Sequence, residues 1–378
     1  MAAVVRFWNA LAALAFAMIT GCGRVGFDAL DLQISPSTTR SNLNTITQFV
    51  ATGGEPPYTF VLESGTGELD QAGTFRAATY PGAATVAVTD ASGDVARASI
   101  TFGGDYLYYM GGFETVPRAD VYRSFDGITW DLIGALPGGR SWGATWVFDD
   151  AMYYAGGDTD GSGNIFYDQV FRSVDGVTWN QIGTLPIPME IPGAAVFKGR
   201  LWVFCGAQFG NGYRRDILSS ADGVTWRTEG QFPIGIHGAE VIVYKDRLWS
   251  LAGHISSGQT NVSFVSDDGV NWTALPAFPA PGEYLAPTVS GDRMWAAGGL
   301  GLADRVVWST DGMTWTDADR LSASRVDARL VEMRGELWII GGQPATTLHS
   351  VSGVGWASAG SFPVSVIGGR MLQFTPAR

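Results

Sequence analysis

The stretch Ser220-Ala221-Asp222-Gly223-Val224-Thr225-Trp226 decides how this chain is built, because close variants of it recur six times after Asp105. Each copy follows an apolar run that ends in a doublet of small residues, a variable loop and a second strand-like run. The copies end at evenly spaced tryptophans: Trp130, Trp179, Trp226, Trp272, Trp315 and Trp356. A repeated unit of this kind predicts a radial array of small β-sheets.

The small-residue doublets set the length of the repeat. They begin at Gly111-Gly112 and end at Gly341-Gly342, and their mean spacing of about 46 residues is typical of four-stranded propeller blades. Within one repeat, residues 238–244 and 247–251 are apolar and β-branched, which predicts two antiparallel strands joined by a tight turn. A third strand leads to the Asp-Gly turn, and the Trp opens a fourth.

The Asp-Gly-x-x-Trp phrase is similar to the Asp-box of sialidases, Ser-x-Asp-x-Gly-x-x-Trp. Here Asp and Gly are adjacent, as in Asp222-Gly223, so the phrase is one residue short of that box. Its residue types suit a structural role: Asp caps a turn, Gly takes a positive φ, and Trp fills the space between adjacent sheets. The phrase therefore gives no reason to expect glycosidase activity.

The apolar run, the doublet and the downstream Trp together resemble kelch repeats from Asp105 to Arg378. The departures are local: Cys205-Gly206 and Ala252-Gly253 replace Gly-Gly, and the sixth turn lacks its Asp. The resemblance implies a six-bladed kelch-like β-propeller. The first repeat lacks a first strand, whereas Gly369–Phe374 resembles one, so we expect the C-terminal strand to complete the first blade and close the ring.

The N-terminus has the pattern of an exported protein. Residues 1–21 contain Arg6 and an apolar stretch too short to span a bilayer, which predicts a signal peptide. Ile19-Thr20-Gly21-Cys22 resembles a bacterial lipobox and implies lipidation of Cys22, followed by a short tether over residues 22–29. Because Gly23 replaces the Asp that retains enteric lipoproteins, the pattern implies a lipoprotein of the cell envelope, in the outer membrane of a Gram-negative bacterium. The membrane would be contacted only through this anchor.

A second β-rich region precedes the repeats. Its short strand candidates are separated by turn residues, as in a small sandwich; they are residues 47–52, 58–63, 73–78, 84–89 and 95–102. The run Gly53–Phe60 resembles immunoglobulin-like spacer modules of bacterial surface proteins, which implies a stalk. The predicted fold is therefore all-β: an immunoglobulin-like β-sandwich over residues 30–103, followed by the propeller over residues 104–378.

Composition narrows the range of partners. The formal net charge is −12, which excludes nucleic acid or anionic lipid as the main partner, since both require a basic face. Once Cys22 is lipidated only Cys205 remains, so no intrachain disulfide can form. We expect a monomer whose ligand is a protein or a glycan.

Candidate binding residues come from aligning the starts of the first strands. The alignment places Glu190, His237 and Glu283 in one column, with Arg140 and Arg325 one position earlier and Trp142 one later. If they meet at the mouth of the central funnel, the two arginines could hold a carboxylated or hydroxylated ligand and Trp142 could stack on it. The alternative is that these loop tips are polar because solvent surrounds them.

Metal and cofactor sites have weak support in the sequence. The three histidines, His237, His254 and His349, show no metal-ligand spacing in the sequence. One oxygen-rich loop has the character of a calcium loop without the full EF-hand pattern; its candidate ligands are Asp158, Asp160, Asn164 and Asp168. A flexible Gly-Ser turn is the alternative, and no other cofactor is expected.

Two functions from different classes fit these features. The first is a non-catalytic binding or scaffold module that a lipoprotein presents outside the cytoplasm. The second is an exported sugar-active enzyme, such as a kelch-type mutarotase or epimerase, in which Glu190 or Glu283 and His237 act as acid and base. No complete catalytic set stands out, which favours the binding module.

Overall fold

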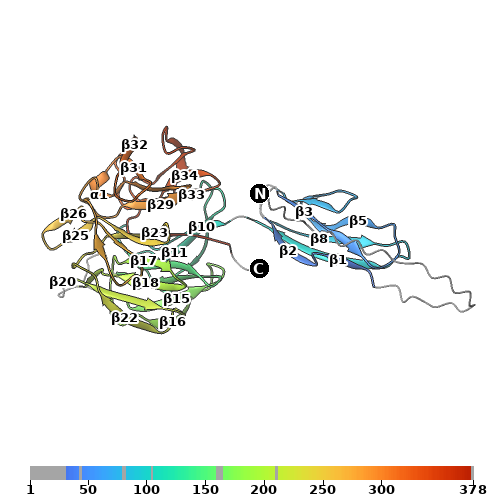
Figure 1. The fold of residues 1–378 in the computed structure, drawn as a ribbon, viewed down its shortest axis with the longest axis horizontal. Coiled ribbons are helices and arrows are strands. Elements are labelled where there is room, and N and C mark those ends of the chain that lie inside the picture. The colour runs from blue at the N-terminus through green and yellow to red at the C-terminus, as the bar shows by residue number, and fades with distance from the viewer. Residues whose placement is uncertain are drawn as a thin grey trace, which may run out of the picture. The chain divides into compact units, whose positions relative to one another are not determined.

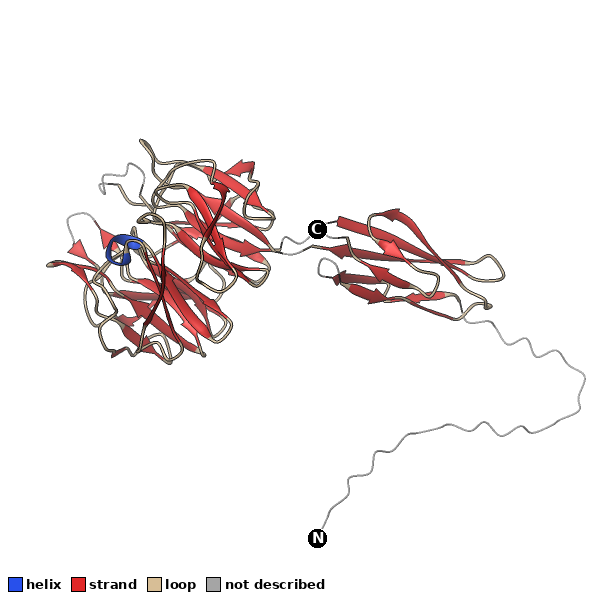
Figure 2. Ribbon diagram, turned by 90° about the horizontal axis from the view of Figure 1, so that it is seen from above, coloured by secondary structure: helices blue, strands red, loops and turns tan. Residues whose placement is uncertain are grey.

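The computed structural model describes residues 31–41, 45–78, 82–103, 105–158, 165–208 and 212–375. The chain divides after Gly103 into two compact units, each described below by itself (Figure 1). Nearly all regular structure is strand, with one short helix, α1 (Gly299–Leu302), in the second unit (Figure 2). The predicted signal peptide and Cys22 lie outside the described residues.

The first unit consists of three sheets. The largest has the order β2-β9-β8-β5, with β2 and β9 parallel and the other pairs antiparallel. Its strands are β2 (Thr38–Ser41), β9 (Val95–Phe102), β8 (Gly82–Thr89) and β5 (Thr59–Gly65). The smaller sheets are β1 (Gln33–Ser35) with β4 (Val50–Thr52), and β3 (Ile46–Gln48), β7 (Thr74–Arg76) and β6 (Glu68–Leu69).

One predicted strand of the first unit is divided in the structure. Residues 47–52 were expected to form a single strand, but β3 ends at Gln48 and β4 begins at Val50. Between them the buried Phe49 packs into the core, 6.4 Å from Phe75 between ring centroids, and its N–H donates to Gly73 O. The chain therefore switches sheets at Phe49, and the buried ring fixes that point.

The second unit contains six four-stranded antiparallel sheets. The first is β37 (Arg370–Phe374), β10 (Tyr106–Met110), β11 (Asp120–Ser124) and β12 (Asp131–Ala135). The second and third are β13 (Ala144–Phe148), β14 (Ala151–Ala155), β15 (Gln169–Ser173) and β16 (Asn180–Thr184), then β17 (Gly193–Phe197), β18 (Arg200–Phe204), β21 (Asp216–Ser220) and β22 (Trp226–Gln231).

The remaining sheets follow the same order. They are β23 (Glu240–Tyr244), β24 (Arg247–Leu251), β27 (Phe264–Ser266) and β28 (Thr273–Ala274); β29 (Ala286–Ser290), β30 (Arg293–Ala297), β31 (Arg305–Ser309) and β32 (Thr316–Arg320); and β33 (Arg329–Met333), β34 (Glu336–Ile340), β35 (Thr346–Ser350) and β36 (Ala357–Ser361). Two small hairpins extend loops, β19 (Ala207–Gln208) with β20 (Gly212–Tyr213) and β25 (Gly253–Ile255) with β26 (Gly258–Thr260).

The recurring turn has the structural role that its residue types predict. In the third repeat, Asp222 Oδ1 accepts hydrogen bonds from the N–H groups of Val224 and Thr225, both at 2.8 Å. Gly223 has a φ of 75°, and its N–H donates to Ser220 Oγ at 2.9 Å. The indole of Trp226 donates back to Gly223 O at 3.1 Å, so the turn satisfies its own polar groups.

The same turn locks neighbouring sheets together. A Cβ built on Gly223 would lie 2.6 Å from the ring of Tyr153 in the preceding sheet, so only glycine fits there. All six turns repeat the contact: Gly127 with Trp338, Gly176 with Tyr108, Gly223 with Tyr153, Gly269 with Trp202, Gly312 with Trp249, and Gly353 with Trp295. The first sheet therefore packs on the sixth just as each later sheet packs on its predecessor.

The C-terminal strand lies where the sequence places it. β37 pairs antiparallel with β10 along its whole length, from Met110 opposite Arg370 to Tyr106 opposite Phe374. A hydrophobic cluster that includes Tyr109 of β10, Trp338 of β34 and the buried Phe362 joins the first and sixth sheets. The expected pairing of the last strand with the first repeat is thus present.

Candidate functional site

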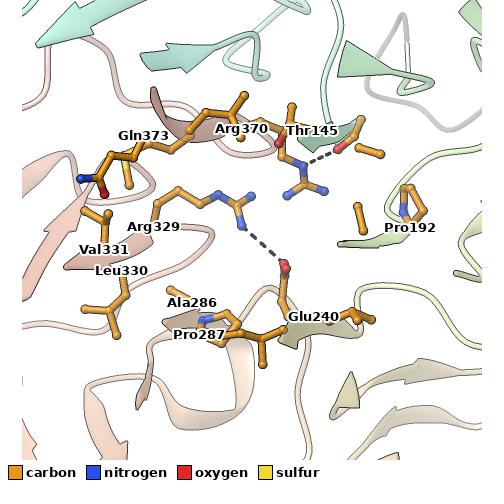
Figure 3. A pocket seen from close by; sticks show the side chains of 17 residues that line it. Thr145, Pro192, Glu240, Ala286, Pro287, Arg329, Leu330, Val331, Arg370 and Gln373 are labelled. Atoms are coloured by element: carbon orange, nitrogen blue, oxygen red, sulfur yellow. Dashed lines mark hydrogen bonds and ion pairs between the residues drawn. The ribbon is translucent and has the colours of Figure 1, made fainter. Parts of the chain in front are cut away.

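One strand of each sheet in the second unit faces a shared cavity. These inner strands, β37, β13, β17, β23, β29 and β33, are each the edge strand of their sheet. They enclose a cavity of about 200 Å³, and every one of them contributes to its lining (Figure 3). The residues that line it are mostly small or apolar, and its charged members are Glu240, Arg329 and Arg370. The cavity is therefore the point on which all six repeats converge.

A ring of residues with left-handed backbone conformation lies just before the inner strands; we call it the collar. Its members, with φ between 50° and 70°, are Trp142, Ile191, Gly238, Tyr284, Asp327 and Gly368. Backbone bonds run from repeat to repeat: Trp142 N–H to Gly368 O at 2.8 Å, Ile191 N–H to Trp142 O at 2.8 Å, and Gly238 N–H to Ile191 O at 3.1 Å. For a β-branched residue such as Ile191 this conformation is strained, so the surrounding repeats hold it in place.

Two aromatic side chains of the collar meet across the axis. Trp142 precedes β13 and Tyr284 precedes β29, three repeats away, yet their ring centroids are 6.4 Å apart. The indole N–H of Trp142 donates to Asp327 Oδ2 at 2.9 Å, and Phe113 stacks on the other side of the ring at 6.3 Å. These contacts hold both rings together at the end of the axis where the inner strands begin.

Arg329 holds the charged lining of the cavity together. Its guanidinium lies 2.8 Å from Asp327 Oδ1 and 3.4 Å from Glu240 Oε1, and it donates to Gly369 O at 2.9 Å. Burial alone would lower the pKa of Arg329, but the charges of Asp327 and Glu240 outweigh that effect and raise it. Arg329 is therefore fully paired.

Arg370 has a different environment at the matching position of the next inner strand. Its Nε–H donates to Gly143 O at 2.5 Å, and none of the ion pairs between described residues involves it. Burial and repulsion from Arg329 lower its pKa. In Figure 3 the guanidinium groups of Arg329 and Arg370 both point toward the middle of the cavity, while Glu240 approaches Arg329. Arg370 is a buried cation without a counter-charge of its own.

Glu283 and His237 form a second cluster of titratable groups beside the collar. Glu283 Oε2 is buried without a hydrogen-bond partner and lies 3.8 Å from His237 Nε2. Burial, reinforced by the charge of Asp327, raises the pKa of Glu283 to about 7. Burial, with a contribution from His254, lowers the pKa of His237 to about 4. Both side chains are thus uncharged at slightly acidic pH, which suits a desolvated site.

The structure corrects the expected funnel mouth at Arg140 and Arg325. Both were expected to be exposed at loop tips, but their exposed fractions are 2% and 1%. Arg140 lies over the ring of Tyr167, 4.0 Å from its centroid, and Arg325 donates to the carbonyl oxygens of Pro344 and Thr346 at 2.6 and 2.7 Å. Both arginines brace loops from a position that points into the core, since the matching residues of three other repeats, Met189, Ile236 and Val366, are fully buried.

Of the other four candidates, Trp142, Glu190 and Glu283 are buried and His237 is partly buried. Trp142 belongs to the collar. Glu283 and His237 come from adjacent repeats and lie next to each other. Glu190 is buried and forms a backbone bridge with Ala207, as His237 does with His254. The alignment of strand starts therefore placed three of the six candidates near the axis, whereas the expectation that they face solvent was wrong.

The candidate calcium loop lies mostly outside the described residues. Asp160 and Asn164 fall there, while Asp158 is buried and bridges Ser141 through two backbone hydrogen bonds. Asp168 is partly exposed. Among the described residues, His, Cys, Asp and Glu form no cluster of three that could hold a metal ion.

Sequence reasoning missed the charged residues that line the cavity. It searched loop tips, whereas Glu240, Arg329 and Arg370 are the first residues of inner strands, three positions after the aligned column. The other three repeats have Ala144, Gly193 and Ala286 at this position. Small residues beside isolated charges in one strand column were the available signal, because a charge in a buried strand needs a reason.

Comparison with known proteins bears on the fold. The solved structure of YjhT aligns with 66% of this chain and 96% of its own length, at 17% sequence identity and a TM-score of 0.54. No protein-family model matches the sequence, and no curated protein is similar enough to show a relationship. The likeness to YjhT supports an all-β, β-propeller-like fold. Within the part of the chain that is described, no helix has the length and apolar character needed to cross a bilayer.

Proposed function

We propose that the second unit is a six-bladed kelch-like β-propeller closed by β37, and that the first unit is an immunoglobulin-like spacer. The six four-stranded sheets, the glycine–aromatic contacts that return from the sixth sheet to the first, and the likeness to YjhT support the propeller. The sandwich-like strand pattern of residues 30–103 and its sequence resemblance to bacterial spacer modules support the second assignment.

We also propose that the chain is exported and anchored by lipid at Cys22, in the cell envelope and outer membrane of a Gram-negative bacterium. The support is the signal-like N-terminus and its lipobox. Cys22→Ser should move the protein from the detergent phase to the aqueous phase without changing its unfolding transition. A variant that still enters the detergent phase would contradict the lipid anchor.

The function that the geometry supports best is ligand binding at the axial cavity, by a non-catalytic module whose partner is a protein or a glycan. The observation that carries this proposal is the cavity to which all six inner strands contribute. Its volume of about 200 Å³ is smaller than the roughly 300 to 1,000 Å³ of sites that enclose a drug-sized ligand. The cavity therefore suits a small molecule or one terminal group of a longer partner.

A cavity-filling variant tests this proposal. Thr145 lines the cavity from β13, and Thr145→Phe adds bulk there without adding charge. We expect the soluble protein to bind a defined group of ligands on a glycan array, and Thr145→Phe to lose that binding. Thr228→Phe makes the same change at an exposed position of β22 and should behave as the wild type. Equal binding by both variants would place the ligand elsewhere.

The sugar-active enzyme is retained as a second candidate because of Glu283 and His237. A carboxyl group whose pKa is raised to about 7 and which lies 3.8 Å from an imidazole is suited to proton transfer near neutral pH. If this is the function, the protein accelerates anomer interconversion of a sugar followed by NMR, and Glu283→Gln slows it. Equal rates for the wild type and the variant would exclude Glu283 as the acid or base.

A further inference from the structure

The two arginines of the cavity occupy equivalent strand positions but differ in their partners. Arg329 contacts Asp327, Glu240 and the Gly369 carbonyl, whereas Arg370 has a single hydrogen bond, from Nε to Gly143 O. Both side chains are deeply buried; Arg370 is 8% exposed. A buried charge normally has a partner, because removal from water is costly. Arg370 is the exception at the axis.

The free part of Arg370 has a defined geometry. A guanidinium group presents two edges that can hold a carboxylate through two parallel hydrogen bonds. Gly143 O occupies Nε, so the edge formed by the two terminal nitrogens remains. None of the described hydrogen bonds uses these nitrogens, and they are absent from the buried polar atoms that lack a partner, so they open onto the cavity.

The charges around Arg370 limit what can bind there. Arg329 engages both nearby carboxylates, Asp327 and Glu240, so the four groups together carry no net formal charge. Because the group is already neutral, any anion adds net negative charge beside Glu240. A singly charged planar anion matches the free guanidinium edge and adds less negative charge than a doubly charged tetrahedral anion does. The apolar residues of the lining, such as Pro192 and Ala286, lower the local dielectric constant and so strengthen such a pair.

We propose that Arg370 is a receptor for the carboxylate of the ligand, held end-on by its two terminal nitrogens inside the axial cavity. This inference rests on the proposed binding function and adds the chemical class of the group that enters the cavity. It also gives a reason for the two unused nitrogens of Arg370, since the carboxylate of the ligand accepts their hydrogen bonds. Arg329 acts as a positioning residue, because it occupies the two carboxylates that would otherwise pair with Arg370.

Benzoate and benzamide form a suitable probe pair, since they share a shape and differ in charge. We expect the wild type to bind benzoate at least about tenfold more tightly than benzamide, the difference typical of a charge-assisted bidentate pair. Benzoate should also shift the Nε–H resonance of Arg370 in the ¹⁵N NMR spectrum. Equal affinities, no binding of benzoate, or tighter binding of inorganic phosphate would overturn the proposal.

Variants assign the preference to Arg370. Arg370→Met should abolish the preference for benzoate, and Arg370→Lys, which keeps the charge but loses the fork, should retain only part of it. Arg227→Lys changes an exposed arginine of β22 and should leave the preference intact. If Arg370→Met does not fold, the Lys variant still decides the question. A preference that survives in Arg370→Lys at full size would contradict the bidentate geometry.

A second arm separates the possible sources of the carboxylate and the two proposals. Glucuronate and an acidic peptide each compete with benzoate only if their carboxylate reaches Arg370, so the stronger competitor identifies a glycan or a protein ligand. If Thr145→Phe loses array binding but ligands with and without a carboxylate bind the wild type equally, the binding function is supported and the proposed role of Arg370 is wrong. If Thr145→Phe leaves array binding unchanged, the binding function itself is wrong.

Discussion

In the second unit, the six Asp-Gly turns, which we call the rim, differ from the residues around the axial cavity in how their polar groups are paired. At the rim, the turn that ends at Trp226 is satisfied internally: Asp222 caps two N–H groups and the indole returns to Gly223 O. At the axis, Glu283 Oε2 has no hydrogen-bond partner and Arg370 has no ion pair among the described residues. Repetition at the rim stabilises the fold, and departure from repetition marks the site.

The collar shows the contrast within a single position of the repeat. Every rim turn has glycine at its left-handed position, whereas four of the six collar residues are not glycine despite a positive φ. Ile191 and Tyr284 hold a conformation that bulky side chains rarely adopt. Strain of this kind persists only where neighbouring elements fix it, and it is concentrated at functional sites. The side chains of the four non-glycine collar residues therefore determine the shape of the site at the axis.

The largest effect that would sharpen this comparison comes from removing β37. Deletion of residues 370–378 leaves β10 without its partner on the axial side and opens the first sheet. We expect the whole second unit to lose cooperative folding, because its neighbours pack on the edge thus exposed. Trp fluorescence reports on this unit, since residues 31–103 contain no Trp. A truncated protein that melts like the parent would show that pairing of β37 with β10 contributes nothing to stability.

The next largest effect concerns the rim. Trp272 packs between sheets, 4.8 Å from Phe232 and 5.2 Å from Phe204 between ring centroids. Trp272→Ala should lower the free energy of unfolding by about 3 to 5 kcal/mol, as loss of a large aromatic packed between elements does. Val224→Ala, at an exposed rim position, serves as control and should change it little. A small loss in both variants would mean that the rim does not supply the stability.

Arg329 should behave as a structural residue even though it lies at the axis. Arg329→Met removes the guanidinium that forms ion pairs with Asp327 and Glu240. We expect a loss of about 3 to 5 kcal/mol in chemical denaturation, since breaking a buried ion pair costs that much. A loss of less than about 1 kcal/mol would show that solvent reaches these carboxylates.

Glu283 and His237 should give opposing contributions to the pH dependence of stability. The folded pKa of Glu283 is about 7, above its usual 4.5, so the folded state binds more protons between these values and stability falls as pH rises. The folded pKa of His237 is about 4, below its usual 6.5, so between these values stability rises with pH. In the wild type the two contributions partly cancel between pH 4.5 and 6.5.

Single variants separate the two contributions. Relative to the wild type, Glu283→Gln should gain about 2 kcal/mol of unfolding free energy as pH rises from 4.5 to 7. His237→Gln should lose a similar amount, about 2 kcal/mol, between pH 4 and 6.5. Urea denaturation at several pH values measures both. Flat difference curves would show that neither group is desolvated at the axis.

The sequence predicted the repeated turns and strands of this molecule because short local patterns of residues determine them. The spacing of Asp222, Gly223 and Trp226 is sufficient for the turn, and a strand-like run at the C-terminus is sufficient to expect pairing with β10. The axial site depends on which residues from the six repeats, far apart in the sequence, lie at the same level along the axis. The alignment column brought Trp142, Glu283 and His237 toward it.

The sequence could not distinguish arginines with different roles. Arg140 and Arg325 precede the inner strands and brace loops from within the core, while Arg329 and Arg370 begin inner strands and face the cavity. The positions differ by a few residues along the same repeat. Which of these positions faces the cavity depends on how the six inner strands pack around it. No single repeat contains that information.

The most direct test of the account compares the unfolding free energies of Arg329→Met and Arg370→Met. Both replace a buried arginine with a side chain of similar length at the same strand position. If Arg370 is held for a ligand, Arg370→Met is neutral or more stable than the wild type, because an unpaired buried charge is removed, while Arg329→Met is destabilised. Equal losses in the two variants would show that Arg370 is a structural residue, and would contradict the division between rim and axis.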